Sequence, residues 1–266
     1  MKIGFIGTGN MGGALARAAA KGGHTLLLAN RTPAKAAVLA KELGGTVCPN
    51  AEAAETAELL FLGVKPQGLP GLAEELAPVL QARKGNAPVV VSMATAVTLR
   101  ELDAMLGGGL PLIRIMPNTP AAVGAGTILY AAQNVTDAQL NAFRAVLAQA
   151  GLLLPLPEAQ IDAASAISGC GPAFCFQFAD ALALGGVRAG LSYPDACRLA
   201  AQTMLGAAEM LLQGGEAPDV LKMRVCSPAG TTIEGVLALE QGGFSYTVQN
   251  AVTAAYRRTV EMTRKG

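Results

Sequence analysis

Residues 3–13 read Ile-Gly-Phe-Ile-Gly-Thr-Gly-Asn-Met-Gly-Gly, an apolar strand that runs directly into Gly-x-Gly-x-x-Gly and then into an Ala-rich helix. This order is what a dinucleotide-phosphate site requires. We expect Gly7 to permit the tight turn, Gly9 to let the backbone approach a pyrophosphate, and Gly12 to let the helix pack closely on the sheet. The helix that begins near Asn10 would direct unpaired N–H groups and its positive dipole end at the anion.

The end of the second predicted strand bears on the choice between NAD and NADP. Residues 25–29 form this strand, and Asn30, Arg31 and Thr32 follow it. An NAD site usually places a carboxylate here, and none is present, whereas Arg31 offers a fork of donors suited to a 2′-phosphate. As alternatives, Arg31 is a solvated charge and Thr32, before Pro33, is a helix N-cap. These residues predict NADP(H) as the preferred cofactor, with NAD(H) as the second choice.

The bulk composition excludes several function classes. At 266 residues the chain can form one large or two modest domains, and its net charge of +1 provides no basic field for nucleic acid or an anionic membrane. No uninterrupted apolar run reaches the roughly 18 residues of a membrane span, and the N-terminus enters a strand without a signal-peptide pattern. Five scattered cysteines without Cys-x-x-Cys spacing indicate reduced thiols. We therefore expect a cytoplasmic protein that binds neither nucleic acid nor membrane.

The histidine content bears on catalysis and on metal binding. His24 is the only histidine, and it lies in a Gly-Gly-His turn before the second strand. A metal site or a catalytic triad built on histidine is therefore excluded, and we interpret His24 as a surface loop residue. No metal site is predicted.

The periodicity of the apolar residues changes near residue 158. Before this point, short apolar runs alternate with helical patterns, which predicts right-handed βαβ units and a doubly wound sheet. Further buried strands are expected over residues 59–64, 89–92, 112–116 and 152–156. Capping boxes are predicted at Thr98 with Glu101 and at Thr136 with Gln139. Beyond residue 158 only helical patterns remain, over 161–186, 194–213, 218–225, 232–240 and 246–263.

These patterns predict an α/β fold with two domains. A doubly wound sheet over residues 1–157 would bind the nucleotide, and an all-α domain would occupy residues 158–266. Hydrophobic residues make up 52% of the chain and charged residues only 15%. Because long apolar helices with few charges are poor material for an isolated bundle, we expect the second domain to form an intertwined homodimer.

One motif closes the fourth strand at the carboxyl edge of the sheet, where open α/β sheets bind ligands. Val64, Lys65 and Pro66 stand there. We expect Lys65 to contact a cofactor ribose or phosphate, and the alternative is a solvated lysine. Pro66 would stop the strand and set the turn.

Two further motifs end the fifth and sixth strands at the same edge. Small residues run from Ser92 to Ala96, and a site lined by residues such as Ala94 would admit a nicotinamide ring. Asn118 and Thr119 lie between two prolines after the sixth strand. They are either donors to the substrate side or simple turn residues.

The helical half contains two stretches that interrupt its periodicity. Residues 168–172, Ser-Gly-Cys-Gly-Pro, must kink or break a helix, either for a close approach of cofactor or substrate or as an ordinary break between helices. Residues 226–234 read Cys-Ser-Pro-Ala-Gly-Thr-Thr-Ile-Glu. Thr231 with Glu234 fits a capping box, which would leave N–H groups and hydroxyls to receive a substrate carboxylate. Helix capping alone is the alternative.

These motifs, in this order, resemble the pyrroline-5-carboxylate reductase family. The resemblance rests on Ile-Gly-Thr-Gly-Asn-Met-Gly-Gly near the start, on Val-Lys-Pro-Gln at 64–67 and on Met-Pro-Asn-Thr-Pro at 116–120. In the second half it rests on residues 168–173 and on Ser-Pro-Ala-Gly-Thr-Thr-Ile at 227–233, which matches the family's own signature. It runs from Ile3 to about Met262.

The resemblance implies NAD(P)H-dependent reduction of 1-pyrroline-5-carboxylate to L-proline, the last step of proline biosynthesis. It also implies a Rossmann domain followed by a helical domain that dimerises, with further assembly into a decamer in some members. In the family, the substrate loop and the cofactor domain come from different subunits. Two residues depart from the family pattern, because Ala96 and Ala229 stand where glycine is usual.

The resemblance assigns roles to individual residues. Thr232 would lie near the ring nitrogen as the catalytic residue, while the loop would grip the substrate carboxylate. The predicted substrate-binding residues are Ser227, Gly230, Thr231 and Thr232. The predicted cofactor-binding residues are Gly7, Gly9, Asn10, Met11, Gly12, Asn30, Arg31, Thr32, Asn50, Val64, Lys65, Pro66, Ala94 and Asn118.

Two rival functions were weighed. A β-hydroxyacid dehydrogenase shares the glycine motif and a helical second half, but in that family a lysine of the first C-terminal helix does the chemistry. Here no lysine lies between Lys84 and Lys222. A catalytically silent NADP(H) sensor is the other rival, and the intact loop at 227–232 argues against it.

Overall fold

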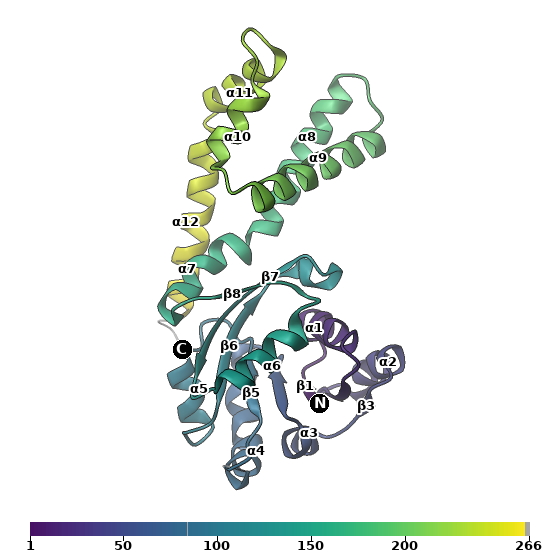
Figure 1. The fold of residues 1–266 in the computed structure, drawn as a ribbon, viewed down its shortest axis with the longest axis vertical. Helices are drawn as coiled ribbons and strands as arrows, with labels where there is room; N and C mark the ends of the chain where they lie inside the picture. Colours follow the sequence, from purple (N-terminus) through teal and green to yellow (C-terminus); the bar gives the residue numbers. More distant parts are fainter. Residues whose placement is uncertain (84, 264–266) are drawn as a thin grey trace. The chain divides into compact units, whose positions relative to one another are not determined.

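Short apolar runs build one sheet in the computed structural model, which describes residues 1–83 and 85–263. The strands are β1 (Lys2–Ile6), β2 (Thr25–Ala29), β3 (Thr46–Val47), β4 (Leu59–Leu62), β5 (Val89–Ser92), β6 (Leu112–Pro117), β7 (Gly126–Gln133) and β8 (Gly151–Pro155). Their order across the sheet is β3-β2-β1-β4-β5-β6-β7-β8 (Figure 1). The chain crosses from β3 back past β1 to β4, so the loops after β1 and β4 flank the switch point where such sheets bind ligands.

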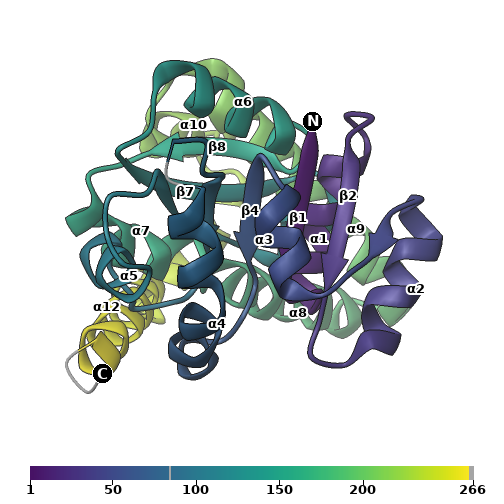
Figure 2. The same cartoon turned by 90° about the horizontal axis from the view of Figure 1, so that it is seen from below.

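Helices cover both faces of the sheet, which is why its strands are apolar at nearly every position. The helices are α1 (Asn10–Ala20), α2 (Pro33–Leu43), α3 (Asn50–Thr56), α4 (Leu69–Ala82), α5 (Leu99–Met105), α6 (Asp137–Leu147) and α7 (Glu158–Ser168). One core cluster joins α1, α2 and α6 to the sheet, and a second joins α3, α4, α5 and α7. Figure 2 shows α3 and α4 in front of the strands. Residues alternate between the two clusters, so Phe5 stacks on Phe61 at 4.6 Å while Ile6 faces the other way.

The β7 strand was missed by the sequence analysis, and it departs from the expected run of parallel βαβ units. β7 pairs antiparallel with β6, whereas the other neighbouring strands pair in parallel. Between β6 and β7 the chain has only a short 3-10 turn, η2 (Thr119–Val123). Because a parallel return needs a crossover of a dozen or more residues, this short connection permits only an antiparallel one.

The helix starts predicted from capping patterns in the first half are confirmed. Thr98 and Glu101 form a reciprocal capping box at α5, and Thr136 and Gln139 form another at α6. Thr32 is the N-cap of α2 and Pro33 its first residue, but no side-chain capping bond is made there. Position alone therefore marks that helix start.

The second half of the chain is helical, as predicted. Its helices are α8 (Gly171–Arg188), α9 (Tyr193–Gly214), α10 (Pro218–Val225), α11 (Thr231–Gln241) and α12 (Phe244–Thr263). The predicted break after Ser168 is confirmed, because the backbone N–H groups of Gly169 and Cys170 both donate to the carbonyl of Ser165. Small residues allow α8 and α9 to pack closely, with Gly186 facing Ala196.

The chain divides into two compact units. The sheet unit comprises residues 1–170 and 256–263 of the described chain, and the helical unit is Gly171–Ala255. Helix α7 falls in the sheet unit because it packs on β6 and β7, where Ile161 is fully buried in the second core cluster. The compact units thus divide after Cys170. The domain boundary expected after Pro157 stays a prediction.

One helical stretch meets the length and hydropathy of a membrane span. The run Glu158–Arg188 does so by length and composition alone, with 6% of its apolar window buried. This stretch contains scattered polar residues, so it forms no continuous apolar run in the sequence. One such helix is weak evidence of a membrane span, because helices of other kinds pass the same test.

Candidate functional site

The three glycines of the first loop have different structural roles. Gly7 has a left-handed φ of 97°, and a Cβ there would overlap the carbonyl group of Gly63. A Cβ on Gly12 would overlap the carbonyl oxygen of Gly7, which explains the close fit of α1 on the turn. A Cβ on Gly9 would meet no atom within 4 Å. Packing within the protein therefore requires glycine at positions 7 and 12. Gly9 is not required by packing, and it lines a cavity with open space beside it.

The N-terminus of α1 is prepared for an anion. Gly9 is its N-cap, no side chain caps the first turn, and that turn holds no acidic residue. The first N–H groups therefore lack the side-chain acceptor that most helices supply, and the helix dipole adds positive potential. The Thr8 hydroxyl, in the glycine loop just before α1, is buried and without a hydrogen-bond partner in the described part of the chain. Buried polar groups without a partner are rare, so this turn fits a bound anionic group.

A cavity of about 700 Å³ opens beside this turn. It brings together predicted cofactor residues from four strand ends: Gly7, Gly9, Asn30, Arg31, Thr32, Asn50, Val64 and Lys65. Asn10, Met11, Gly12, Pro66, Ala94 and Asn118 do not line it. A second cavity of about 450 Å³ shares Asn30, Arg31, Asn50 and a glutamate, Glu75, with the first.

The sequence analysis missed several residues that line the larger cavity. They are Lys35 on α2, Gln67 and Gly68 of η1 (Pro66–Gly68), and Gly71, Leu72 and Glu75 on α4. Lys35 has a sequence signal, because it falls in the first turn of the helix that follows Arg31. The α4 residues have none, since only tertiary packing decides which face of a helix borders a cavity.

Two asparagines form hydrogen bonds that connect the elements around this cavity. The Asn30 carbonyl accepts from the backbone N–H of Thr8 at 3.2 Å, and its amide donates to the carbonyl of Thr32 at 3.0 Å. The Asn50 amide donates to Glu75 at 3.0 Å. Asn30 therefore ties the glycine turn to the loop after β2, and Asn50 ties the start of α3 to α4.

The other predicted residues at the sheet edge lie in the loops after β5 and β6. Ala94 is buried, and its N–H donates to the Ser92 hydroxyl at 3.3 Å. The Asn118 amide donates to the carbonyl of Ser168 at 2.8 Å, and its carbonyl accepts from the N–H of Thr127 at 2.8 Å. Asn118 thus joins β6, β7 and the end of α7, a structural role that goes beyond the local turn considered from the sequence. Its predicted contact with a ligand stays a prediction.

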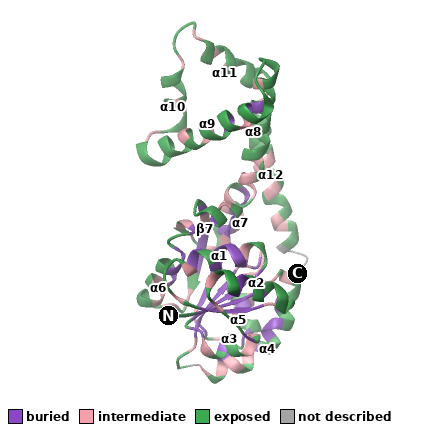
Figure 3. Cartoon of the chain, turned by 90° about the vertical axis from the view of Figure 1, so that its right-hand side faces the viewer, coloured by how far each residue is buried: buried purple, intermediate pink, exposed green. Residues whose placement is uncertain are grey.

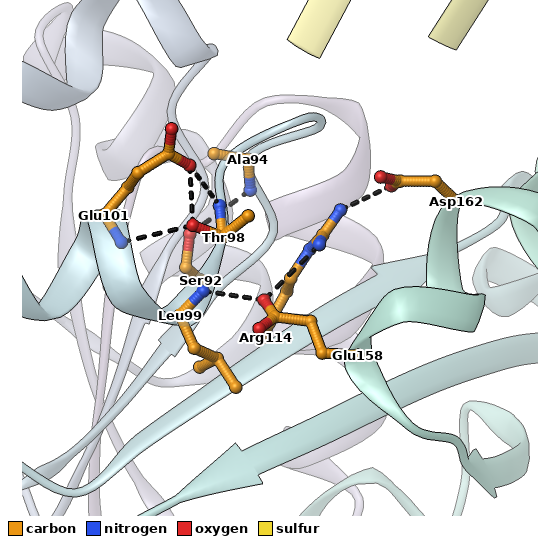
Figure 4. A network of polar contacts seen from close by, with 8 residues as sticks. All are labelled: Ser92, Ala94, Thr98, Leu99, Glu101, Arg114, Glu158 and Asp162. Carbon is orange, nitrogen blue, oxygen red and sulfur yellow. Dashed lines mark hydrogen bonds and ion pairs between the residues drawn. The ribbon is translucent and has the colours of Figure 1, made fainter. Parts of the chain in front are cut away.

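A buried arginine organises the loop after β5 (Figure 4). Arg114 on β6 is 3% exposed and pairs with Asp162 at 2.5 Å and with Glu158 at 3.4 Å, both on α7. Glu158 also accepts from the first N–H of α5, that of Leu99, at 2.6 Å. Arg114 is thereby paired with two carboxylates. The Glu158 carboxylate also connects the end of the loop after β5 to β6 and to α7.

Two titratable groups have a shifted pKa, one in the first turn of α5 and one in the wall of the smaller cavity. Hydrogen bonds from the backbone N–H and the hydroxyl of Thr98 lower the pKa of Glu101 from its usual value, so this cap stays ionised at neutral pH. Burial raises the pKa of the Cys48 thiol, which lines the smaller cavity as an unreactive neutral group. Within residues 1–83 and 85–263, no cluster of three His, Cys, Asp or Glu residues could hold a metal ion.

The loop before α11 is built around Gly230. This residue is the N-cap of α11, and its N–H donates to the carbonyl of Ser227 at 3.0 Å. A Cβ on Gly230 would overlap the Ser227 hydroxyl and lie 3.1 Å from the Ser227 carbonyl oxygen, so a larger residue here would require the Ser227 side chain to move. Ser227, Thr231 and Thr232 are exposed.

The capping box predicted at Thr231 and Glu234 is wrong. No side chain caps α11, because Gly230 takes the N-cap position and Thr231 becomes the first helical residue. A side-chain hydroxyl caps the first-turn N–H groups from the N-cap position, and Thr231 lies one residue after that position. The first-turn N–H groups therefore have no side-chain acceptor, which is the condition that the predicted carboxylate site requires.

Comparison with known proteins identifies the family. Residues 158–262 match the pyrroline-5-carboxylate reductase dimerisation family, and residues 2–96 match the NADP oxidoreductase, coenzyme F420-dependent family. The pyrroline-5-carboxylate reductase of Synechocystis sp. is 39% identical over all of this chain and 99% of its own length. The chain belongs to the pyrroline-5-carboxylate reductase family.

Solved structures of pyrroline-5-carboxylate reductases extend the similarity to the fold. The Coxiella burnetii enzyme has a TM-score of 0.89 and 32% identity, with 97% of each chain covered. The Plasmodium falciparum enzyme, solved with NADP bound, has a TM-score of 0.86 and 30% identity, with 99% of each chain covered. The expected Rossmann-type sheet with an all-α dimerisation region is therefore confirmed.

The two departures from the usual pyrroline-5-carboxylate reductase pattern share one backbone feature. Ala96 has a φ of 62° and Ala229 a φ of 55°, both in the left-handed region. Glycine adopts this conformation without a steric penalty, whereas alanine is strained by about 1 kcal/mol. One of these alanines lies in the loop after β5 and the other in the loop before α11.

Proposed function

We propose that this protein reduces 1-pyrroline-5-carboxylate to L-proline, the last step of proline biosynthesis, with NADPH as the preferred reductant and NADH as the second choice. The observation that supports this most strongly is the whole-chain identity of 39% to a pyrroline-5-carboxylate reductase, with the loops at both predicted sites intact. The relative solved with NADP bound supports the choice of cofactor.

The chain's own residues fit a dinucleotide phosphate site. The uncapped first turn of α1 and the open space over Gly9 would receive the pyrophosphate. Arg31 and Lys35 on one wall of the cavity would neutralise a 2′-phosphate. Bound NADPH supplies the hydride.

We assign the substrate to the loop before α11. The hydroxyl of Ser227 and the first-turn groups of α11 at Thr231 would bind the carboxylate, and Thr232 would orient the ring nitrogen by a hydrogen bond. A protonated imine carbon accepts hydride without an enzymic base, so these residues have only to hold and align the substrate. The single histidine of the chain is accordingly not needed for the chemistry.

The proposed active form is a homodimer in the cytoplasm, in which the substrate loop of one subunit serves the cofactor domain of the other. The match of residues 158–262 to a dimerisation family supports the homo-oligomer. Assembly into a decamer, and the absence of nucleic acid and membrane from its partners, belong to the same proposal.

A cofactor-oxidation assay tests the function. NADPH absorbance should fall when 1-pyrroline-5-carboxylate is added and stay constant with no substrate, and a 3-hydroxy acid should not reduce NADP⁺. A protein that binds NADPH but does not oxidise it when any of these compounds is added would be the silent NADP(H) binder. Thr232→Ala should lower turnover or raise the Michaelis constant at least tenfold or so, and unchanged kinetics would refute the role of Thr232.

A further inference from the structure

Helix α4 contributes a carboxylate, that of Glu75, to the wall of the predicted nucleotide cavity. Glu75, on the second turn of α4, lines both the larger and the smaller cavity, as Arg31 does. Among the described residues that line the two cavities, it is the one acidic side chain, against Arg31, Lys35 and Lys65. The sequence places it 44 residues after Arg31, so no local motif connects them.

The position of Glu75 is defined by a hydrogen bond. Its carboxylate accepts from the Asn50 amide at 3.0 Å, and Asn50 also lines both cavities. The glutamate is therefore held at the wall where the loop after β2, the start of α3 and α4 meet. The same wall contains Arg31, the arginine suited to a 2′-phosphate.

We propose that Glu75 sets the choice between the two cofactors by weakening the preference for NADP(H). This inference rests on the proposed function, because it concerns the nucleotide that the cavity holds. In an NAD site a carboxylate after the second strand accepts from the adenosine ribose hydroxyls. Here the loop after β2 lacks one, and Glu75 supplies a carboxylate to the same cavity from α4.

The effect follows from charge. A 2′-phosphate is attracted by Arg31 and Lys35 and repelled by Glu75, whereas a ribose hydroxyl is neutral and donates a hydrogen bond to the carboxylate. Arg31 therefore strengthens the binding of NADP(H) and Glu75 weakens it. Both side chains are compatible with bound NAD(H). Since the side chain of Glu75 is exposed, salt reduces this repulsion.

The test is a fluorescence titration of the full-length protein with NADPH and with NADH, in the absence of substrate. Glu75→Gln retains an acceptor for Asn50 and removes only the charge. It should tighten NADPH binding roughly fivefold, with little change for NADH, and the gain should shrink at high salt. The control is Glu74→Gln, which removes the same charge from the neighbouring exposed residue of α4, outside both cavity walls.

The outcomes separate the two proposals. If Glu75→Gln and Glu74→Gln have the same ratio of NADH to NADPH dissociation constants, the role of Glu75 is refuted while the reductase function stands. If the native protein binds neither nucleotide, the proposed function fails and the role of Glu75 fails with it. A gain for NADPH that does not depend on salt would also overturn the proposal, because it would show a packing effect instead of a charge effect.

Discussion

The sheet unit and the helical unit are both rich in apolar residues, but they bury them to different extents. In the sheet unit Phe5, Phe61 and Phe143 are at most 1% exposed and belong to one core cluster, and a second core cluster lies on the other face of the sheet. In the helical unit the buried hydrophobic residues are three alanines, Ala183, Ala196 and Ala200. Figure 3 shows this contrast in the burial of the two units.

The two units differ in whether their large apolar side chains are buried within the chain or left exposed on its surface. The sheet unit removes its large side chains from water within one chain, which stabilises it by roughly 25 cal/mol for each Å² of apolar surface. The helical unit leaves Leu205 53% exposed and Leu212 80% exposed. Exposed apolar helices of this kind mark an interaction surface, and a second copy of the dimerisation region is the partner that the family supplies.

The largest expected effect is on the helical unit. Leu205→Glu places a charge on the apolar face of α9, and we expect it to separate the subunits and to lower the melting temperature by roughly 10 °C. Light scattering after size-exclusion chromatography measures the mass, and calorimetry measures the transition.

The matched control is Val38→Glu on α2 of the sheet unit, which is 71% exposed. It should leave the mass and the melting temperature nearly unchanged. Equal effects of the two substitutions would mean that the exposed residues of the helical unit are no more covered in solution than those of the sheet unit.

The second prediction contrasts two glycines of the same turn. Gly12→Ala forces a methyl group against the carbonyl oxygen of Gly7 and should destabilise the sheet unit by about 3 kcal/mol. Gly9→Ala adds a methyl group in open space, so stability should change by less than about 0.5 kcal/mol while NADPH binds roughly tenfold more weakly. Urea unfolding and nucleotide titration separate the two, and a Gly9→Ala protein with unchanged affinity would show that the open space does not face the ligand.

The third prediction concerns the arginine that links the sheet to α7. Arg114→Met removes the partner of Glu158 and Asp162, whose side chains are 29% and 22% exposed. Because these carboxylates retain some contact with water, the expected loss is about 2 kcal/mol, which is less than for a fully buried pair. Urea unfolding measures it. A gain in stability would show that the desolvation of the ion pairs outweighs their attraction.

The smallest predicted effect compares one substitution in both units. Ala96→Gly and Ala229→Gly each relieve a left-handed alanine, and each should stabilise its own loop by about 0.5–1 kcal/mol. Differential scanning calorimetry of the two variants compares the sheet unit with the helical unit. If either substitution destabilises the protein, the entropy of the unfolded chain outweighs the strain at that loop.

Much of the sheet unit could be predicted because its signals are local. The glycine turn, the strand ends and two capping boxes each depend on residues close in sequence. The strand β7 was missed because no α-helix separates it from β6, so the alternation of strands and helices does not mark it. The capping box at Thr231 was wrong because a one-residue shift of the helix start, decided by the extended backbone of Gly230, changes which side chain can cap.

The sequence by itself determined the fold class, the family and the residues of the two loops that carry its signature, because these depend on short spacings between neighbouring residues. Only the tertiary structure decided that α4 brings Glu75 to the cavity wall, that Asn118 and Arg114 hold loops in place, and that α7 packs on the sheet. These contacts join residues that are 25 to 50 positions apart, and their partners are selected by the packing of whole helices on the sheet.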